Sequence, residues 1–186
     1  MAIGMHPGLD AGIPSRHLWS TFASFVPRRL EEFDALARGV HWAKSNDGSE
    51  DFCITGTAGT GKTHLLAAAI AARLEAGDAS ARFVDVPTLT AWVNQASADD
   101  VQTYVDELCG ASALAMDDIG QCGAGRWGAE IVKVVLEWRR LADKPTIVSS
   151  PLGGDTFHDL GYCTLEEELG LMNYACLQRP TAQSND

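Results

Sequence analysis

Hydrophobic residues along the chain alternate between two kinds of pattern. Short apolar runs bounded by turn residues are typical of strands, and apolar residues three or four positions apart are typical of helices. Strands are expected at 52–54, 81–86, 113–116 and 145–149. Helices are expected at 28–44, 62–76, 88–95, 97–109 and 129–141. This alternation predicts an α/β fold with a central parallel sheet flanked by helices.

The order of these segments predicts three parts of the chain. Residues 1–27 carry Pro7, Pro14 and Pro27 and are expected to form an arm that packs on the core. Residues 28–152 form the predicted core. Residues 153–186 are an acidic C-terminal segment, in which the capping-box pattern of 164–167 predicts a short helix.

A glycine-rich loop follows the first predicted strand and matches G-x-x-x-x-G-K-[ST] in full. Its glycines allow backbone N–H groups to turn inward around phosphate, a lysine adds a cation, and a threonine hydroxyl can ligate Mg²⁺. The next helix begins at this loop, so its positive end also faces the phosphates. The predicted nucleotide-binding residues are Gly56, Thr57, Ala58, Gly59, Thr60, Gly61, Lys62, Thr63 and His64. Of these, His64 is also open to local packing without a chemical role.

Two aspartates come directly after the third predicted strand. Carboxylates at the carboxyl end of a buried parallel strand emerge where α/β sheets bind ligands. Asp117 is therefore expected to hold Mg²⁺ together with Thr63, and Asp118 to orient or deprotonate an attacking water. A pair of helix-capping carboxylates is the plainer alternative.

Two further pairs are weaker candidates. Ser149 and Ser150 end the fourth predicted strand, either as γ-phosphate sensors or as plain strand-end residues. Arg139 and Arg140 close the long helix, where they either contact DNA or a neighbouring subunit or complement the helix dipole.

Composition narrows the function classes. The formal net charge is −11, which argues against coating duplex DNA by charge alone. The five cysteines include no CxxC pair, so they are expected to be ordinary reduced thiols rather than a zinc site or disulfide framework. The longest apolar run has eight residues, whereas a membrane-spanning helix needs about 20. A cytoplasmic protein without a membrane partner is expected.

Longer motifs resemble one family. GTAGTGKTHLLAAAIAARLEAG, ALAMDDIG, RWGAEIVKVVLEWRR and KPTIVSS are similar to the bacterial replicative-helicase loaders, the DnaC/DnaI-like AAA+ ATPases, and to the IstB-type transposition ATPases. The similarity covers about residues 13–152 and includes the IPSRHLWSTFASF arm. It implies Mg²⁺-ATP binding, ATP-dependent assembly of several copies, contact with single-stranded DNA, and delivery of a replicative ring helicase.

The chain departs from that family in its last segment. Pro151 stands where the family has a polar sensor, and Arg179 is the one Lys or Arg in residues 152–186. Since an arginine commonly stabilises the γ-phosphate charge during hydrolysis, a reduced or atypical lid and slow ATP hydrolysis are expected. The expected function is an ATP-hydrolysing helicase-loader-like protein of DNA replication. An IstB-like transposition ATPase, a non-hydrolysing nucleotide-dependent adaptor and, more remotely, a small-molecule kinase are the alternatives.

Overall fold

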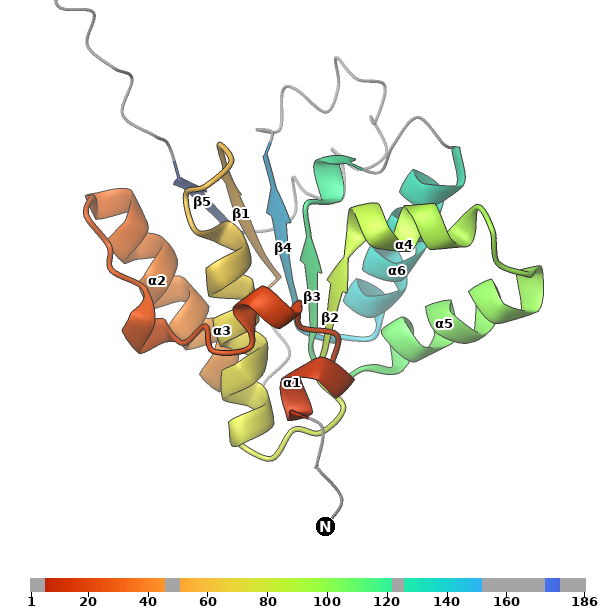
Figure 1. The fold of residues 1–186 in the computed structure, drawn as a ribbon, viewed down its shortest axis with the longest axis horizontal. Helices are drawn as coiled ribbons and strands as arrows, with labels where there is room; N and C mark the ends of the chain where they lie inside the picture. Colours follow the sequence, from red (N-terminus) through yellow and green to blue (C-terminus); the bar gives the residue numbers. More distant parts are fainter. Residues whose placement is uncertain (1–5, 46–50, 122–125, 152–172, 178–186) are drawn as a thin grey trace, which may run out of the picture.

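In the computed structural model, helices cover both faces of a five-stranded sheet (Figure 1). The structure describes residues 6–45, 51–121, 126–151 and 173–177. The strands are β1 (Phe52–Gly56), β2 (Arg82–Asp85), β3 (Leu114–Asp117), β4 (Thr146–Ser150) and β5 (Asn173–Leu177). The α-helices are α1 (Pro7–Asp10), α2 (Leu30–Lys44), α3 (Lys62–Glu75), α4 (Val86–Val93), α5 (Ala98–Gly110) and α6 (Arg126–Leu141). Three short 3₁₀ helices are η1 (Ser15–His17), η2 (Phe22–Ser24) and η3 (Ile119–Gln121).

The strands pair in parallel in the order β2-β3-β4-β1-β5. From β1 the chain crosses to the far edge at β2 and returns through β3 to β4, so β1 and β4 lie side by side at a topological switch point. Ligands in open α/β sheets bind beyond the carboxyl ends of the strands at such a point. The α/β prediction is confirmed.

One strand of the sheet is absent from the prediction. Sequence patterning predicts four strands, whereas β5 pairs with the whole of β1 and forms an edge of the sheet. The rest of the predicted C-terminal segment, including the short helix after 164–167 and the lid, lies outside the described residues.

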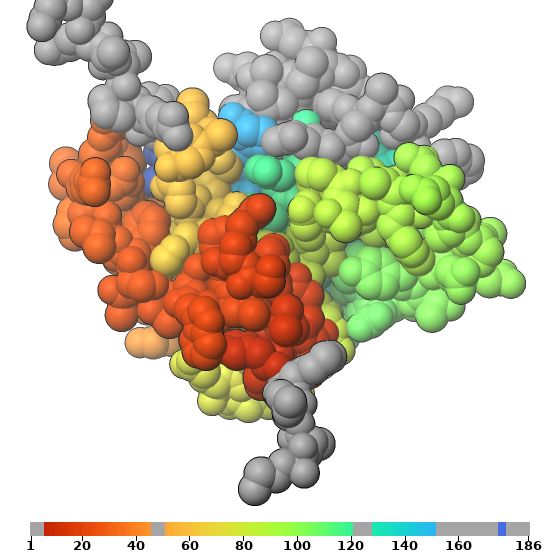
Figure 2. All heavy atoms as spheres, viewed as in Figure 1, coloured from red at the N-terminus to blue at the C-terminus, as the bar shows by residue number. Residues whose placement is uncertain are grey.

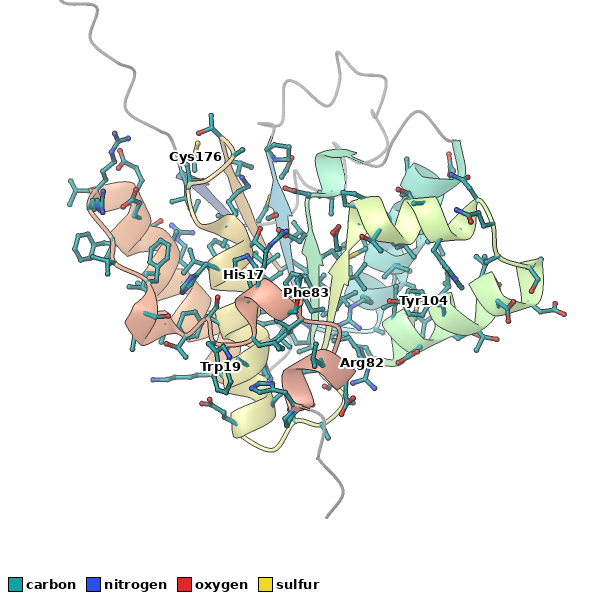
Figure 3. The ribbon with its side chains drawn as sticks, viewed as in Figure 1. His17, Trp19, Arg82, Phe83, Tyr104 and Cys176 are labelled. Atoms are coloured by element: carbon teal, nitrogen blue, oxygen red, sulfur yellow. The ribbon has the colours of Figure 1, made fainter. Side chains whose placement is uncertain are left out.

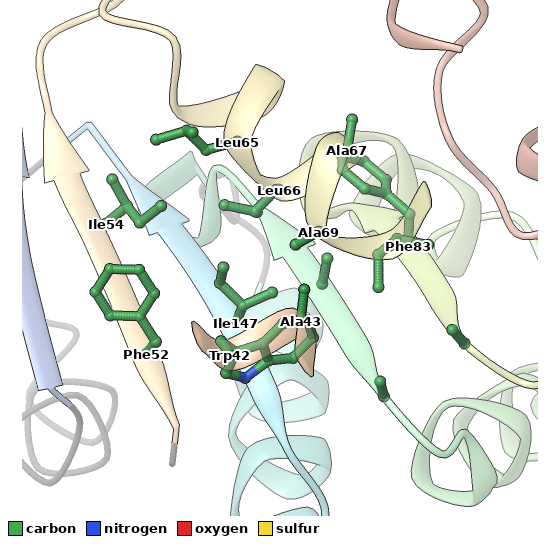
Figure 4. Packing of buried hydrophobic residues seen from close by; sticks show 14 of the residues in the cluster. Trp42, Ala43, Phe52, Ile54, Leu65, Leu66, Ala67, Ala69, Phe83 and Ile147 are labelled. Atoms are coloured by element: carbon green, nitrogen blue, oxygen red, sulfur yellow. The ribbon is translucent and has the colours of Figure 1, made fainter. Parts of the chain in front are cut away.

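Side chains of each strand alternate between the two faces of the sheet, which is the period-2 rule of strands. Phe52, Ile54 and Ile147 join one core with Leu65, Leu66 and Trp42 from α3 and α2 (Figure 4). Cys53, Val148 and Met116 face the opposite core beneath α4, α5 and α6. Both faces of the central strands are therefore dry, which explains why their sequences read as continuous apolar runs.

The N-terminal arm lies across α3 and reaches the β2 edge of the sheet (Figure 2). The Phe83 backbone N–H donates to the Ala11 carbonyl oxygen at 2.7 Å, which engages an outward-facing amide of β2. Further along, η1 and η2 contact the start of α3. The arm thus joins the sheet edge to the glycine-rich loop.

Arg139, near the end of α6, has a fully buried side chain and acts as a structural cation. Its guanidinium donates from Nη1 to the carbonyl oxygens of Leu108 at 2.8 Å and Ala111 at 2.7 Å, and from Nη2 to that of Pro145 at 2.9 Å. Its Nε donates to Thr146 Oγ1 at 3.0 Å. Burial lowers the pKa of Arg139 to about 10, so the group remains protonated at neutral pH.

These contacts overturn one expectation. With its donors engaged and its side chain inaccessible, Arg139 offers no surface to DNA or to another subunit, so that prediction is wrong for Arg139. Arg140 is half-buried, and its DNA or inter-subunit contact stays a prediction.

No helix in the described part of the chain is long and apolar enough to cross a membrane. Among the described cysteines, Cys53, Cys109 and Cys176 form no disulfide with one another.

Candidate functional site

The glycine-rich loop connects the carboxyl end of β1 to the first residue of α3. Gly59 and Gly61 have φ angles of 77° and 93°, in the left-handed region that favours glycine. Gly61 is the N-cap of α3, so the unpaired N–H groups of the first turn point toward the loop. The loop and the helix end together form a cradle suited to an anion.

At two positions of this loop, close neighbours leave room for glycine only. A Cβ built on Gly56, whose φ is 144°, would lie 1.8 Å from the Leu177 carbonyl oxygen of β5. A Cβ on Gly61 would lie 2.6 Å from Phe25 Cε2 of the arm. The loop is therefore held between the edge strand on one side and the arm on the other.

Lys62 is buried, and its amine lies within the loop. Nζ donates to the Gly56 carbonyl oxygen at 2.7 Å and to the Thr57 carbonyl oxygen at 3.1 Å. Burial lowers the pKa of Lys62, while Asp118 and Asp117 act in the opposite direction. Lys62 thus brings a cation to the cradle, balanced by two carboxylates across it.

Asp117 and Asp118 are joined to β4 through one hydroxyl. The Ser149 hydroxyl donates to Asp117 Oδ1 at 2.5 Å, and the Asp118 backbone N–H donates to Ser149 Oγ at 3.0 Å. Ser149 and Asp117 are buried, and Asp118 is half-buried with a left-handed φ of 58°. Aspartate is one of the few residues that tolerate this conformation, and the Ser149 bridge helps to fix it.

The surroundings of Asp118 raise the pKa of its carboxyl. Burial raises the pKa of its carboxyl, Asp117 raises it further, and Lys62 lowers it. A carboxylate with a raised pKa is a stronger base than an ordinary aspartate.

A cavity of about 380 Å³ brings these groups together. It is lined by Ala58, Gly59, Gly61, Lys62, Thr63, His64, Asp118, His17 and Pro151. Seven of these residues were predicted as part of the site, although they come from two separate segments of the sequence. The predicted Thr60 supports the loop from within, since its hydroxyl donates to the Thr57 carbonyl oxygen at 2.9 Å.

His17 is a residue of the site that sequence reasoning missed. It lies on η1 of the arm (Figure 3), and its Nδ1 is 3.0 Å from Ser20 Oγ. Burial lowers the pKa of His17, and the charge of the neighbouring, exposed Arg16 lowers it further. The arm mixes basic and aromatic residues, but nothing in their spacing indicates that it lies over the loop.

His64 connects the arm to α3. Its Nε2–H donates to the Thr21 carbonyl oxygen at 2.9 Å and lies 3.2 Å from Ser24 Oγ. The same ring packs against Phe25, with centroids 5.6 Å apart. This is the local packing that the sequence left open, at a position that also lines the cavity.

The two serines at the end of β4 are both buried, but their surroundings bear differently on the predicted sensor role. The Ser149 hydroxyl is engaged by Asp117 and Asp118, so its position favours holding those aspartates rather than reading a γ-phosphate. Ser150 follows at the strand end, next to Pro151 of the cavity lining, and its sensor role stays a prediction.

The donor set fits Mg²⁺ bound together with phosphates. No group of three or more His, Cys, Asp or Glu side chains among the described residues is arranged to hold a metal. Mg²⁺ in nucleotide sites is instead held by one or two carboxylates, waters and substrate phosphates. Thr63, on the cavity wall, and Asp117, beside Asp118, offer oxygen atoms of that kind.

Comparison with known families gives one match over most of the chain. The model described as the UvrD/REP helicase N-terminal domain matches residues 41–184. The chain belongs to this family. A search of curated proteins finds no match for this UvrD/REP-family chain.

Solved structures resemble the UvrD/REP-family chain in fold. The DnaC helicase loader superposes with a TM-score of 0.71 at 19% identity, covering 88% of this chain and 99% of that one. DnaI gives 0.74 at 17% identity, covering 89% and 93%. A primosome component from Streptococcus pyogenes serotype M3 gives 0.74 at 18% identity, covering 92% and 94%. The predicted AAA+-like P-loop fold and the resemblance to DnaC and DnaI are confirmed at the level of the fold.

Proposed function

We propose that this chain is a Mg²⁺-dependent ATPase of DNA replication that acts with a replicative ring helicase, as helicase loaders do. The observation that carries the proposal is the single cavity in which the phosphate cradle, Lys62, Thr63 and Asp118 meet. Among the structural neighbours are the DnaC helicase loader and a DnaA bound to the ATP analogue AMPPCP.

Each residue has a role that follows from its position. The loop amides and Lys62 bind the β- and γ-phosphates, and Thr63 and Asp117 hold the metal. Bound Mg²⁺ neutralises charge that develops on the phosphate oxygens. Asp118 orients the attacking water and accepts its proton, while Ser149 keeps both aspartates in place.

Arg16 and His17 extend the site from the arm. The described residues of the cavity wall carry Lys62 as their one permanently charged cation. Arg16 is exposed and precedes His17 on η1, so it brings a second positive charge next to the cavity wall. We therefore assign Arg16 to stabilising the charge on the phosphates. In residues 152–186, Arg179 is the one Lys or Arg that offers a cation for this role.

The partners follow from the same resemblance. A neighbour described as DnaA is bound to single-stranded DNA. We expect this chain to contact such DNA weakly, because its formal net charge is −11. ATP-dependent self-association and helicase binding complete the proposal.

The family match favours a second candidate, a helicase-type motor domain that itself separates strands. The IstB-like and non-hydrolysing alternatives share the cradle and differ in partner and turnover.

Steady-state ATP turnover with Mg²⁺, with and without single-stranded DNA, tests the proposal against Lys62→Ala. DNA-stimulated turnover that Lys62→Ala abolishes supports a loader-type ATPase. Strand separation by the chain alone assigns it to the helicase-type motor. ATP binding without turnover leaves the non-hydrolysing adaptor.

A further inference from the structure

A second hollow lies at the β2 edge of the molecule, between the arm and the helices α4 and α5. Phe83, Leu89, Trp92 and Tyr104 line a cavity of about 360 Å³. A neighbouring cavity of about 400 Å³ shares Trp92 and Tyr104 with it. The two cavities share these aromatic residues and are together called here the α4–α5 groove. None of its lining residues belongs to the glycine-rich loop.

The centre of the groove is apolar and meets solvent. The Trp92 and Tyr104 rings pack edge to face with centroids 5.3 Å apart, and Trp92 remains 38% exposed. Figure 3 shows Tyr104 among the helices on this side and Phe83 on β2. Paired aromatic side chains around a hollow are typical of the anchor points of protein interfaces.

The rim of the groove is acidic. Asp85 lines the first cavity, and Asp100 and Glu107 line the second. The sequence has no Lys or Arg between Arg82 and Arg126, and Arg82 pairs with Glu107 at 3.0 Å. Charge complementarity therefore selects a cationic occupant and disfavours a nucleic acid, whose phosphates would meet these carboxylates.

The shape of the β2 edge decides which backbone can enter. The Phe83 N–H is already bonded to Ala11 O, and a Cβ on Gly12 would lie 2.3 Å from Phe83 O. Because the arm covers the outward-facing backbone groups of Phe83, an added strand cannot pair with β2 there. An amphipathic helix, which enters a groove through side chains alone, fits instead.

We propose that the α4–α5 groove docks a basic amphipathic helix of a partner protein. Leucine-sized or aromatic side chains of that helix pack against Trp92 and Tyr104. Its Lys or Arg residues face Asp85 and Asp100, because Glu107 is already paired with Arg82. The groove and the cavity at the glycine-rich loop share no lining residue, so we expect docking without bound nucleotide.

Fluorescence anisotropy with a labelled amphipathic peptide of leucine and lysine tests this proposal. The structure predicts binding that weakens at least 10-fold in Trp92→Ala and falls with added salt. Trp138→Ala, which truncates a tryptophan 46% exposed on α6, is the matched control and leaves binding unchanged. Asp100→Asn weakens binding about 3-fold, whereas Glu31→Gln on α2 does not.

Three outcomes overturn the proposal. Equal binding of a scrambled peptide of the same composition, or equal losses in Trp92→Ala and Trp138→Ala, shows attraction to net charge alone. Competition by single-stranded DNA assigns the groove to nucleic acid. Concentration-dependent dimerisation that Trp92→Ala abolishes assigns it to a second copy. Unchanged peptide binding by Lys62→Ala separates this test from the proposed ATPase function.

Discussion

Replacing Arg139 by methionine removes a buried guanidinium while retaining most of its volume. Four hydrogen bonds of 3.0 Å or less disappear, and they connect α6 to the end of α5, to Ala111 beyond it, and to the start of β4. The carbonyl oxygens of Leu108, Ala111 and Pro145 lose these donors inside the protein.

The expected cost follows from the strength of such bonds. A hydrogen bond to a charged group contributes about 1.5–3 kcal/mol, and deleting one partner of a buried charged cluster costs about 3–5 kcal/mol. Because the individual terms do not add, and because methionine also ends the desolvation of a buried cation, we expect a loss of about 4 kcal/mol. For a domain of this size, the Tm falls by about 8–16 °C.

Urea unfolding followed by circular dichroism measures this loss, with Arg38→Met as the control. Arg38 forms an exposed pair with Asp34 at 2.8 Å on α2, and such pairs contribute less than about 1 kcal/mol. A free energy of unfolding for Arg139→Met within 1 kcal/mol of that for Arg38→Met would refute the assigned structural role.

Three further substitutions test the site itself. Asp118→Asn is expected to retain ATP binding and to lower kcat at least 100-fold. As the pH is lowered, the wild-type kcat should begin to fall at a higher pH than an ordinary aspartate would give, because the pKa of Asp118 is raised. Ser149→Ala, measured by unfolding and by Mg²⁺-ATP titration, should lose about 2 kcal/mol of stability and bind Mg²⁺-ATP more weakly, since Asp117 loses its hydroxyl partner; wild-type values for both would contradict the bridge. Arg16→Ala should reduce kcat more than ATP affinity, whereas Arg28→Ala, also on the arm side, should change neither.

Much of the fold could be predicted because both faces of the central strands are buried. Apolar runs such as 113–116 therefore stood out, and the motif at 56–63 placed the cradle at the junction of β1 and α3. Since carboxyl ends of parallel strands meet at one edge, the sequence also placed Asp118 opposite Lys62.

Other features depend on long-range contacts that leave no periodic signal. The five residues of β5 are stabilised by pairing with β1, which local pattern does not reveal. His17 reaches the cavity through the path of the arm, and Arg139 found carbonyl partners up to 31 positions away. From sequence alone, an arginine near a helix end is interpreted as a surface residue, because the segments that bury it lie far away along the chain.

Isothermal titration of Mg²⁺-ATP into the wild-type chain and into Lys62→Ala tests the central claim most directly. The account predicts one saturable site in the wild type and at least a 10-fold loss of affinity in Lys62→Ala, with the fold retained by circular dichroism. Equal affinity in the two proteins, or no binding by the wild type, would contradict a nucleotide site at the glycine-rich loop.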